Sequence, residues 1–213
     1  MSRLQLAVDA PEHLALVPRL RDHFDVIEVG TPVLKRFGLA AISTVLELSG
    51  GLPVLADTKT ADGGALEAEM VFAAGASMMT VLAHASPATR AATRGVADHY
   101  GAEIVLDTIL DGAIDQLSLV DGTDGEGAWL ALHAPSDVRL AGVETKDHIL
   151  GVGRARADGF RVSLAGGIRR ENLDQVLDVT PDIIVIGSGV TGANDPEEEA
   201  AWIRNQVDVA AGS

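Results

Sequence analysis

Eight short apolar runs, spread over the whole chain, most restrict how this sequence can fold. Successive runs start 21 to 33 residues apart, which leaves room for one strand, one helix and two short loops but is too long for hairpins. Each run ends at a polar residue and is followed by a stretch with helical periodicity. The predicted strands are Leu4–Val8, Asp25–Val29, Pro53–Ala56, Met78–Leu82, Glu103–Leu106, Ala128–Leu132, Arg161–Ala165 and Asp182–Ile186.

Eight repeated strand–helix units close most simply into a barrel. We therefore expect an α/β protein, a (βα)8 TIM barrel that forms one domain over residues 1–213. The continuous apolar run Ile183–Ile186 supports this, because parallel strands wrapped by helices are covered on both faces. A doubly wound open sheet is the alternative. The barrel predicts that the chemistry lies at the carboxyl ends of the strands.

Two helices can be predicted in detail. The last is expected to begin at Pro196, with Asp195 as its N-cap, and to bury Ala200, Ile203, Val207 and Ala210 along one face. A helix between the third and fourth runs is expected to end at Gly75 and to repeat Leu66, Met70 and Ala73 or Ala74 along its apolar face. Asp121–Gly127, rich in Gly and Asp, is predicted to be a loop.

Composition excludes several classes of function. The chain has 16 Lys and Arg against 31 Asp and Glu, a formal net charge of −15, which disfavours nucleic acid and anionic membranes as partners. It has no cysteine, so disulfides, thiolate nucleophiles and cysteine metal sites are excluded. We find neither a long apolar run nor a signal peptide and expect a soluble, cytoplasmic protein.

Ionisable residues lie at or just beyond the ends of five of the predicted strands. Since the carboxyl ends of barrel strands meet at one mouth, we expect these side chains to converge there. Any single acid after a strand could instead be a helix N-cap. The residues are Asp9, Glu28, Asp57, Asp107 and His133, with Lys59 and Asp62 close behind Asp57.

The stretch Asp57-Thr-Lys59-Thr-Ala-Asp62 is the most informative of these. Asp57 and Lys59 alternate along a strand, so both can point to the same side, and a lysine between acids keeps its proton and can stabilise a developing negative charge. The alternative is a solvated cluster of ion pairs.

Glu28 stands within an apolar run, where a carboxylate is costly without a cation. A hard metal shared with Asp57 is the chemical interpretation, and Mg2+ fits oxygen ligands best. The alternative is a buried glutamate paired with Lys59 or another basic residue.

His133 ends the sixth strand beside carboxylates, where it could act as general acid or base near neutral pH. A hydrogen-bonded structural histidine is the alternative. His84, after the fourth strand, is a second candidate. The remaining histidines lie in helical segments and are expected to be peripheral: His13, His23, His99 and His148.

Two glycine-bearing turns follow the last two strands, and together they predict a phosphorylated ligand. Barrel enzymes often bind phosphate with backbone N–H groups at these two positions, and this would let a strongly acidic protein hold an anion. Arg169 and Arg170 could add positive charge or could be exposed helix-start residues. The turns contain Gly166 and Gly167, and Gly187, Ser188 and Gly189.

These motifs resemble the orotidine-phosphate-decarboxylase superfamily, and within it the group of 3-hexulose-6-phosphate synthases and 3-keto-L-gulonate-6-phosphate decarboxylases. The resemblance covers nearly the whole chain. It rests on Leu4–Asp9, Ile27–Pro32, Asp57–Asp62, Thr80–Leu82, His133, Ala165–Ile168 and Gly187–Ala193 with Asp195 and Pro196.

The resemblance implies a homodimeric barrel in which Glu28 and Asp57 hold Mg2+ against an enediolate. By the same similarity, Asp9 and Lys59 bind substrate and steady the anion, Asp107 orients the sugar chain and His133 shuttles protons. Asp62 reaches across into the partner's active site.

Within the group, the resemblance favours the synthase, which joins formaldehyde to D-ribulose 5-phosphate. The decarboxylases typically carry an arginine where this chain has Ser136 and a glutamate where it has Asp107. A sugar-phosphate decarboxylase is the first alternative, and a non-catalytic phosphosugar-binding barrel is the second.

Overall fold

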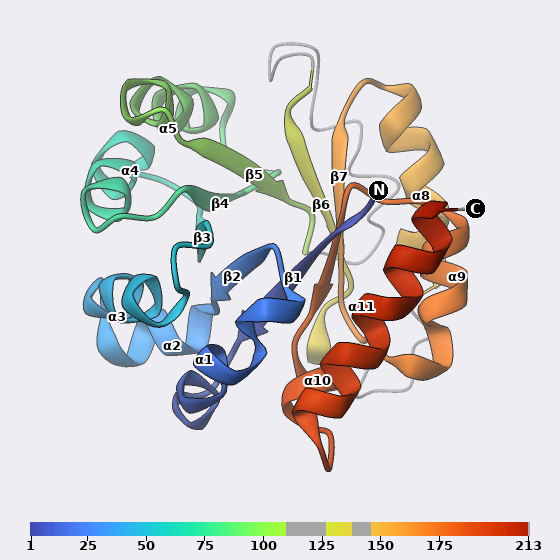
Figure 1. Ribbon diagram of the computed structural model, residues 1–213. Helices are drawn as coiled ribbons and strands as arrows, with labels where there is room; N and C mark the ends of the chain where they lie inside the picture. The colour runs from blue at the N-terminus through green and yellow to red at the C-terminus, as the bar shows by residue number, and fades with distance from the viewer. Residues whose placement is uncertain (110–126, 138–145, 213) are drawn as a thin grey trace.

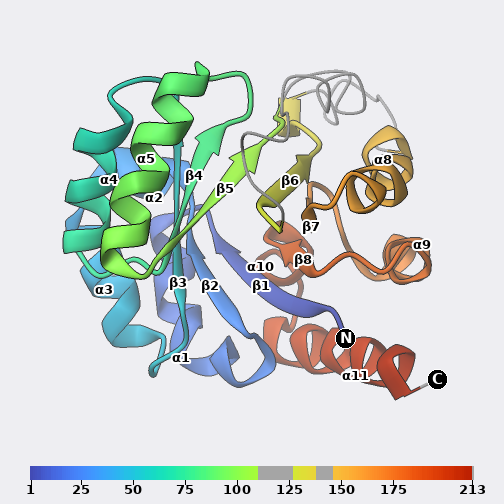
Figure 2. The same ribbon diagram turned by 90° about the horizontal axis from the view of Figure 1, so that it is seen from above.

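The strands form a closed parallel barrel in sequence order, β1 to β8, which confirms the predicted TIM barrel (Figures 1 and 2). The structure, a computed structural model, describes residues 1–109, 127–137 and 146–212. The strands are β1 Arg3–Val8, β2 Val26–Val29, β3 Val54–Thr60, β4 Met78–Leu82, β5 Glu103–Asp107, β6 Trp129–His133, β7 Arg161–Ala165 and β8 Ile183–Ile186.

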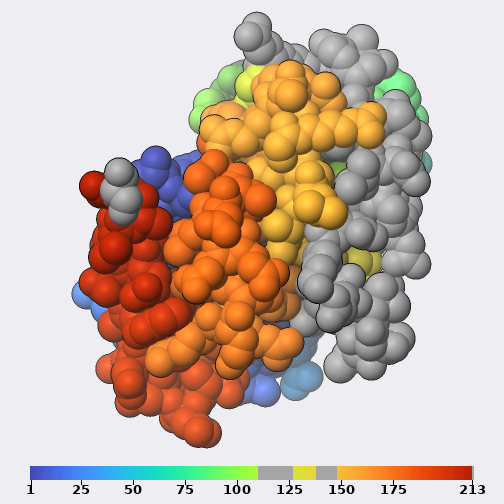
Figure 3. Space-filling view, turned by 90° about the vertical axis from the view of Figure 1, so that its right-hand side faces the viewer, coloured from blue at the N-terminus to red at the C-terminus, as the bar shows by residue number. Residues whose placement is uncertain are grey.

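The helices of the described residues lie outside the barrel, and Figure 3 shows α8, α9 and α11 covering one side of it. The α-helices are α1 Val17–Leu20, α2 Thr31–Phe37, α3 Ala40–Leu48, α4 Gly64–Ala73, α5 Pro87–Tyr100, α8 Lys146–Ala157, α9 Leu173–Asp178, α10 Ser188–Thr191 and α11 Pro196–Gly212. Short 3-10 helices span Pro11–Leu16, Arg21–His23 and Arg170–Asn172. None of the helices in these ranges is long and apolar enough to cross a membrane.

Alternation along each strand separates two buried layers. On β1, Leu4, Leu6 and Val8 belong to the core between strands and helices, while Ala7 belongs to a smaller cluster inside the barrel. At the amino ends of the strands, Trp129 lies against the guanidinium groups of Arg3 and Arg161, 5.1 and 4.3 Å from its ring centre. At the opposite, carboxyl ends of the strands the barrel opens into a cavity.

Most predicted strands agree with the structure to within one residue, but β3 does not end at Ala56. It continues to Thr60 and therefore carries Asp57 and Lys59 within the strand. The predicted loop Asp121–Gly127 lies outside the described residues except for Gly127.

For the two helices predicted in detail, α4 and α11, the predicted ends are right, but the predicted buried faces are partly wrong. The Asp195 side chain accepts hydrogen bonds from the backbone N–H groups of Glu197 and Glu198, both at 3.1 Å, which confirms the cap of α11. Ala210 is exposed, because α11 runs past the barrel there. In α4 the predicted apolar face was wrong: Leu66 and Met70 are 69% and 43% exposed, and the helix instead buries Ala68, Val71 and Phe72.

Candidate active site

A cavity of about 480 Å3 opens at the carboxyl ends of the strands. It brings together most of the predicted site residues, from strands far apart in sequence. Those that line it are Asp9, Glu28, Asp57, Lys59, Asp107, His133, Gly166, Gly167, Gly187, Ser188 and Gly189. Asp62 is exposed and does not line this cavity, and neither His84 nor the four histidines expected to be peripheral line it.

Lys59 occupies the centre of the polar network. Its Nζ donates to both carboxylate oxygens of Asp57 at 2.8 Å and to Oδ2 of Asp107 at 3.0 Å. Burial alone lowers the pKa of Lys59, but the charges of Asp107 and Asp57 outweigh it, and the net pKa is raised. Lys59 is therefore an ammonium group at neutral pH.

Asp107 links this lysine to His133. Its Oδ2 lies 3.4 Å from Nδ1 of His133, and its side chain is almost fully buried. Burial raises the pKa of Asp107, but His133 and Lys59 more than offset that and the net pKa is lowered. Its other oxygen, Oδ1, is buried without a hydrogen-bond partner in the described part of the chain.

Two further acids that line the cavity, Glu28 and Asp9, are affected by the charges of neighbouring carboxylates. Burial, then the charges of Asp57 and Asp9, raise the pKa of Glu28 well above its usual value. Burial and Asp57 likewise raise the pKa of Asp9. The side-chain amide of Gln5 donates to Oε2 of Glu28 at 2.5 Å. A divalent cation would relieve the repulsion that these shifts report.

The donor chemistry of Glu28 and Asp57 fits the predicted magnesium site. Both are hard oxygen donors on one cavity wall, and Mg2+ is commonly held by one or two carboxylates completed by water and substrate. No group of three His, Cys, Asp or Glu side chains within residues 1–109, 127–137 and 146–212 is arranged as a metal cluster. The metal therefore stays a prediction.

The alternative of an ion pair between Glu28 and Lys59 is not what the structure shows, because the described bonds of Lys59 Nζ go to Asp57 and Asp107. Nor are Asp57 and Lys59 a solvated cluster, since their side chains are 8% and 20% exposed.

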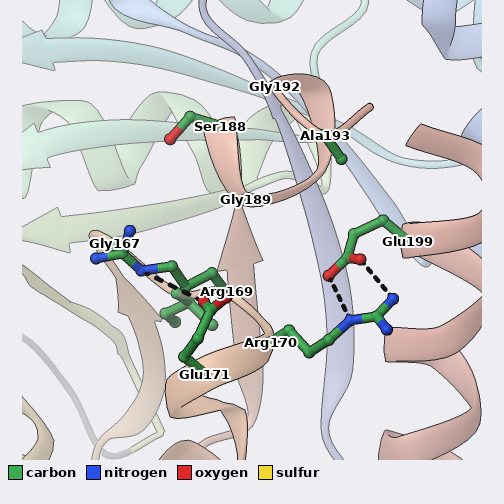
Figure 4. Close-up of a pocket in the computed structure, with 10 residues that line it drawn as sticks. Gly167, Arg169, Arg170, Glu171, Ser188, Gly189, Gly192, Ala193 and Glu199 are labelled. Carbon is green, nitrogen blue, oxygen red and sulfur yellow. Dashed lines mark hydrogen bonds and ion pairs between the residues drawn. The ribbon is translucent and has the colours of Figure 1, made fainter. Parts of the chain in front are cut away.

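The two glycine turns adjoin each other at the edge of the cavity. A Cβ on Gly189 would lie 2.3 Å from the carbonyl oxygen of Ile168, so the turns touch, and Gly166 has a φ of 105°. A second hollow of about 270 Å3 shares Gly167, Ser188 and Gly189 with the cavity (Figure 4).

Both arginines line this second hollow, but they differ. Arg170 is committed to Glu199, which accepts from its Nη2 at 2.6 Å, and it stacks on Trp202 at 4.3 Å. The side chain of Arg169 is 65% exposed and its Nε lies 3.7 Å from Glu171 (Figure 4). Of the two arginines, Arg169 therefore stays the better candidate for binding the phosphate of a ligand.

Nearly the whole chain matches a known family. The model of the "Orotidine 5'-phosphate decarboxylase / HUMPS family" matches residues 2–203. The chain belongs to this family. The 3-hexulose-6-phosphate synthase of Bacillus subtilis (strain 168) is 30% identical over 208 residues, which cover 96% of this chain and 98% of that protein.

Solved structures of this orotidine 5'-phosphate decarboxylase / HUMPS family agree. The 3-hexulose-6-phosphate synthase from Salmonella typhimurium has a TM-score of 0.90 and 32% identity, and covers 98% of this chain and 99% of its own. KGPDC from Streptococcus mutans, solved in complex with a sugar phosphate, has a TM-score of 0.88 and 25% identity, covering 98% of both chains. The predicted enzyme class, a carbon–carbon lyase, is confirmed.

Sequence reasoning missed several residues that line the cavity of this family member: Gln5, Thr31, Thr80, Asp137 and Ser163. The alternation of β1 could have found Gln5, because it lies two residues before Ala7 and four before Asp9. Nothing in the local sequence distinguishes Thr80 or Ser163 from an ordinary strand residue.

Proposed function

We propose that this protein is a magnesium-dependent aldolase of the 3-hexulose-6-phosphate synthase type, which joins formaldehyde to D-ribulose 5-phosphate through an enediolate. The observation that carries the proposal is the Lys59 ammonium held between Asp57 and Asp107, with His133 beside it and two glycine turns at the cavity edge. The synthase relatives support the same chemistry.

The residues divide the work between binding and proton transfer. Backbone N–H groups of the glycine turns, with Arg169, hold the phosphate, while Asp9 and Asp107, which line the cavity, accept from sugar hydroxyls. Glu28 and Asp57 hold Mg2+, which when bound supplies charge stabilisation without a covalent intermediate.

The carbon–carbon bond forms at C1 of the pentulose. His133 takes a proton from C1, and Lys59 stabilises the negative charge that develops on the enediolate oxygens. C1 then bonds to the carbon of formaldehyde, and His133 returns the proton to the aldehyde oxygen as its double bond opens. The product is a 3-hexulose 6-phosphate.

Cavity charge favours aldol addition over decarboxylation. A keto-sugar acid phosphate would bring one more carboxylate into a cavity lined by Asp57, Asp107 and Asp137, while the one lysine that lines the cavity in the described ranges is already shared by two of these acids. Like charges at short range are unfavourable in a poorly solvated site. Formaldehyde carries no charge and meets no such penalty.

Assays with purified protein separate the candidates. We expect formaldehyde-dependent consumption of ribulose 5-phosphate that is lost in EDTA and restored by Mg2+. Lys59→Ala should lower kcat/KM by about 10²–10³-fold or more, since it removes the main cation of the site. Arg154→Ala, which removes a cation from an exposed position of α8 outside the cavity, is the matched control and should leave kcat/KM unchanged.

Other outcomes identify the alternatives. Release of CO2 from 3-keto-L-gulonate 6-phosphate without formaldehyde would establish the decarboxylase, for which the KGPDC structure is the precedent. Tight binding of ribulose 5-phosphate by calorimetry, with no turnover of either substrate, would establish a binding protein. Full activity of Lys59→Ala would overturn the mechanism.

We also propose that the enzyme works as a homodimer in which Asp62 completes the partner's active site. Asp62 is exposed and lies outside its own cavity, although it follows β3 by only two residues. Large apolar side chains are exposed on or beside the neighbouring helices α2, α3 and α4: Phe37, Leu39, Leu46, Leu66 and Met70. A second copy covering them would explain both observations.

A further inference from the structure

The strand that carries Asp57 and Lys59 leaves its regular pairing where these residues lie. Ala56 is opposite Met79 of β4 and Thr60 is opposite Val81, so three residues of β3 face the single residue Thr80. Such bulges re-aim side chains and leave backbone groups without ladder partners. The hydrogen bonds of this bulge must therefore come from elsewhere.

Thr80 supplies them. Its hydroxyl accepts from the backbone N–H of Lys59 at 2.8 Å and donates to Oδ1 of Asp57 at 2.8 Å. Its carbonyl oxygen accepts from the Thr58 hydroxyl at 2.7 Å. One residue of β4, only 5% exposed, thus holds all three residues of the bulge.

The hydrogen bond from Lys59 to Thr80 is made by a residue whose backbone conformation is unfavourable. Lys59 has a φ of 49°, in the left-handed region that side chains other than glycine rarely occupy. This conformation persists only where the surroundings enforce it, and it is characteristic of functional sites. A hydroxyl has one proton to donate and two lone pairs, so Thr80 can bond Lys59 and Asp57 at the same time.

We propose that Thr80 is a positioning residue for catalysis: its hydroxyl fixes the Lys59 backbone and one Asp57 oxygen, so that the lysine ammonium reaches both Asp57 and Asp107. Thr80 acts through these two residues. The kinetic part of this inference rests on the proposed function, whereas the positioning itself does not.

Three variants test the inference. Thr80→Val removes the hydroxyl at nearly constant shape, and Thr80→Ser keeps it. Thr93→Val is the matched control, because Thr93 is also buried and, among the described residues, its hydroxyl donates to a carbonyl of its own helix, α5. Should Thr80→Val fail to fold, Thr80→Ala removes the hydroxyl without placing a methyl group in its position and carries the same test.

The first readout is hydrogen exchange of the Lys59 backbone amide, measured by NMR on the protein without substrate or added metal. We expect exchange at least about tenfold faster in Thr80→Val than in the wild type or Thr80→Ser, since the amide loses its acceptor. An unchanged Lys59 amide in Thr80→Val would overturn the inference.

The second readout is turnover of ribulose 5-phosphate with formaldehyde. A misplaced lysine should lower kcat by about 10²-fold in Thr80→Val while KM stays within a few-fold, because the phosphate end is untouched. Thr80→Ser should recover most of kcat, and Thr93→Val should not change it. If Thr80→Val keeps kcat, or Thr80→Ser is as impaired as Thr80→Val, the inference fails.

The two proposals fail in different ways. A wild type that does not turn over these substrates would refute the proposed function, and the Lys59 amide would still decide whether Thr80 holds the bulge.

Discussion

Asp107 remains ionised in an almost dry position because His133 and Lys59 face it. Its lowered pKa means that the folded state favours the carboxylate. We predict that Asp107→Asn destabilises the protein by about 3 kcal/mol at pH 7, since one partner of a buried ion pair is removed. Urea titrations of both proteins measure the difference.

The pH dependence follows from the sign of that shift. The stabilisation by Asp107 is fully present above the pKa of an aspartate in the unfolded chain, about 3.9, and is lost as the pH falls through the lower folded value. The gap between wild type and Asp107→Asn should therefore shrink below about pH 4. A gap that widens in acid would contradict the ion pair.

Glu28 shows the opposite behaviour. Its raised pKa means that ionised Glu28 costs stability in the metal-free protein, and this cost grows as the pH rises from about 4.3 through the folded value. We predict that Glu28→Gln raises Tm at pH 8 in EDTA by about 2–4 °C, for a gain of order 1 kcal/mol, and has no such effect at pH 4. Turnover should be lost, which distinguishes a functional carboxylate from a structural one.

At the scale of elements, the turns after β7 and β8 act as one unit. A methyl group on Gly189 would strike the carbonyl of Ile168 and push the turns apart. We predict that Gly189→Ala raises KM for ribulose 5-phosphate about 10–100-fold, as expected for one or two lost hydrogen bonds to a charged group, with little change in kcat.

Gly95→Ala is the control for this substitution. A Cβ at Gly95, in α5, meets no atom within 4 Å, so KM should stay at the wild-type value and stability should rise by about 0.5–1 kcal/mol. Equal KM values for Gly189→Ala and the wild type would show that the phosphate does not bind at these two turns.

Elements also show what the sequence can and cannot predict. Strand order and the inward Asp57, Asp107 and His133 were predictable, because alternation and spacing fix which side chains reach the mouth of a barrel. The buried face of α4 was not predictable. Apolar residues occur on more than one face of this helix, and Leu66 is exposed although its spacing with Met70 is helical. Thr80 was out of reach as well, since its role depends on a bulge in another strand.

On the scale of the whole molecule, a protein of net charge −15 must concentrate its few cationic and N–H groups to hold a phosphate. The barrel does so by placing Lys59, Arg169 and the glycine turns at one end. Large apolar side chains are exposed on or beside α2, α3 and α4, and Asp62, which precedes α4, does not line its own cavity. Both features are explained together if two copies share their sites.

Mixing two inactive variants tests this arrangement. Lys59→Ala and Asp62→Ala should each lose turnover, and co-expression should restore it to about a quarter of the wild-type level. Half of the randomly paired dimers are mixed, and each mixed dimer combines one intact Lys59 with one intact Asp62 at one of its two sites. Light scattering should give the mass of two chains. Mixtures that stay inactive while the variants remain dimeric would show that Asp62 does not cross the interface, and an active Asp62→Ala alone would remove it from the site.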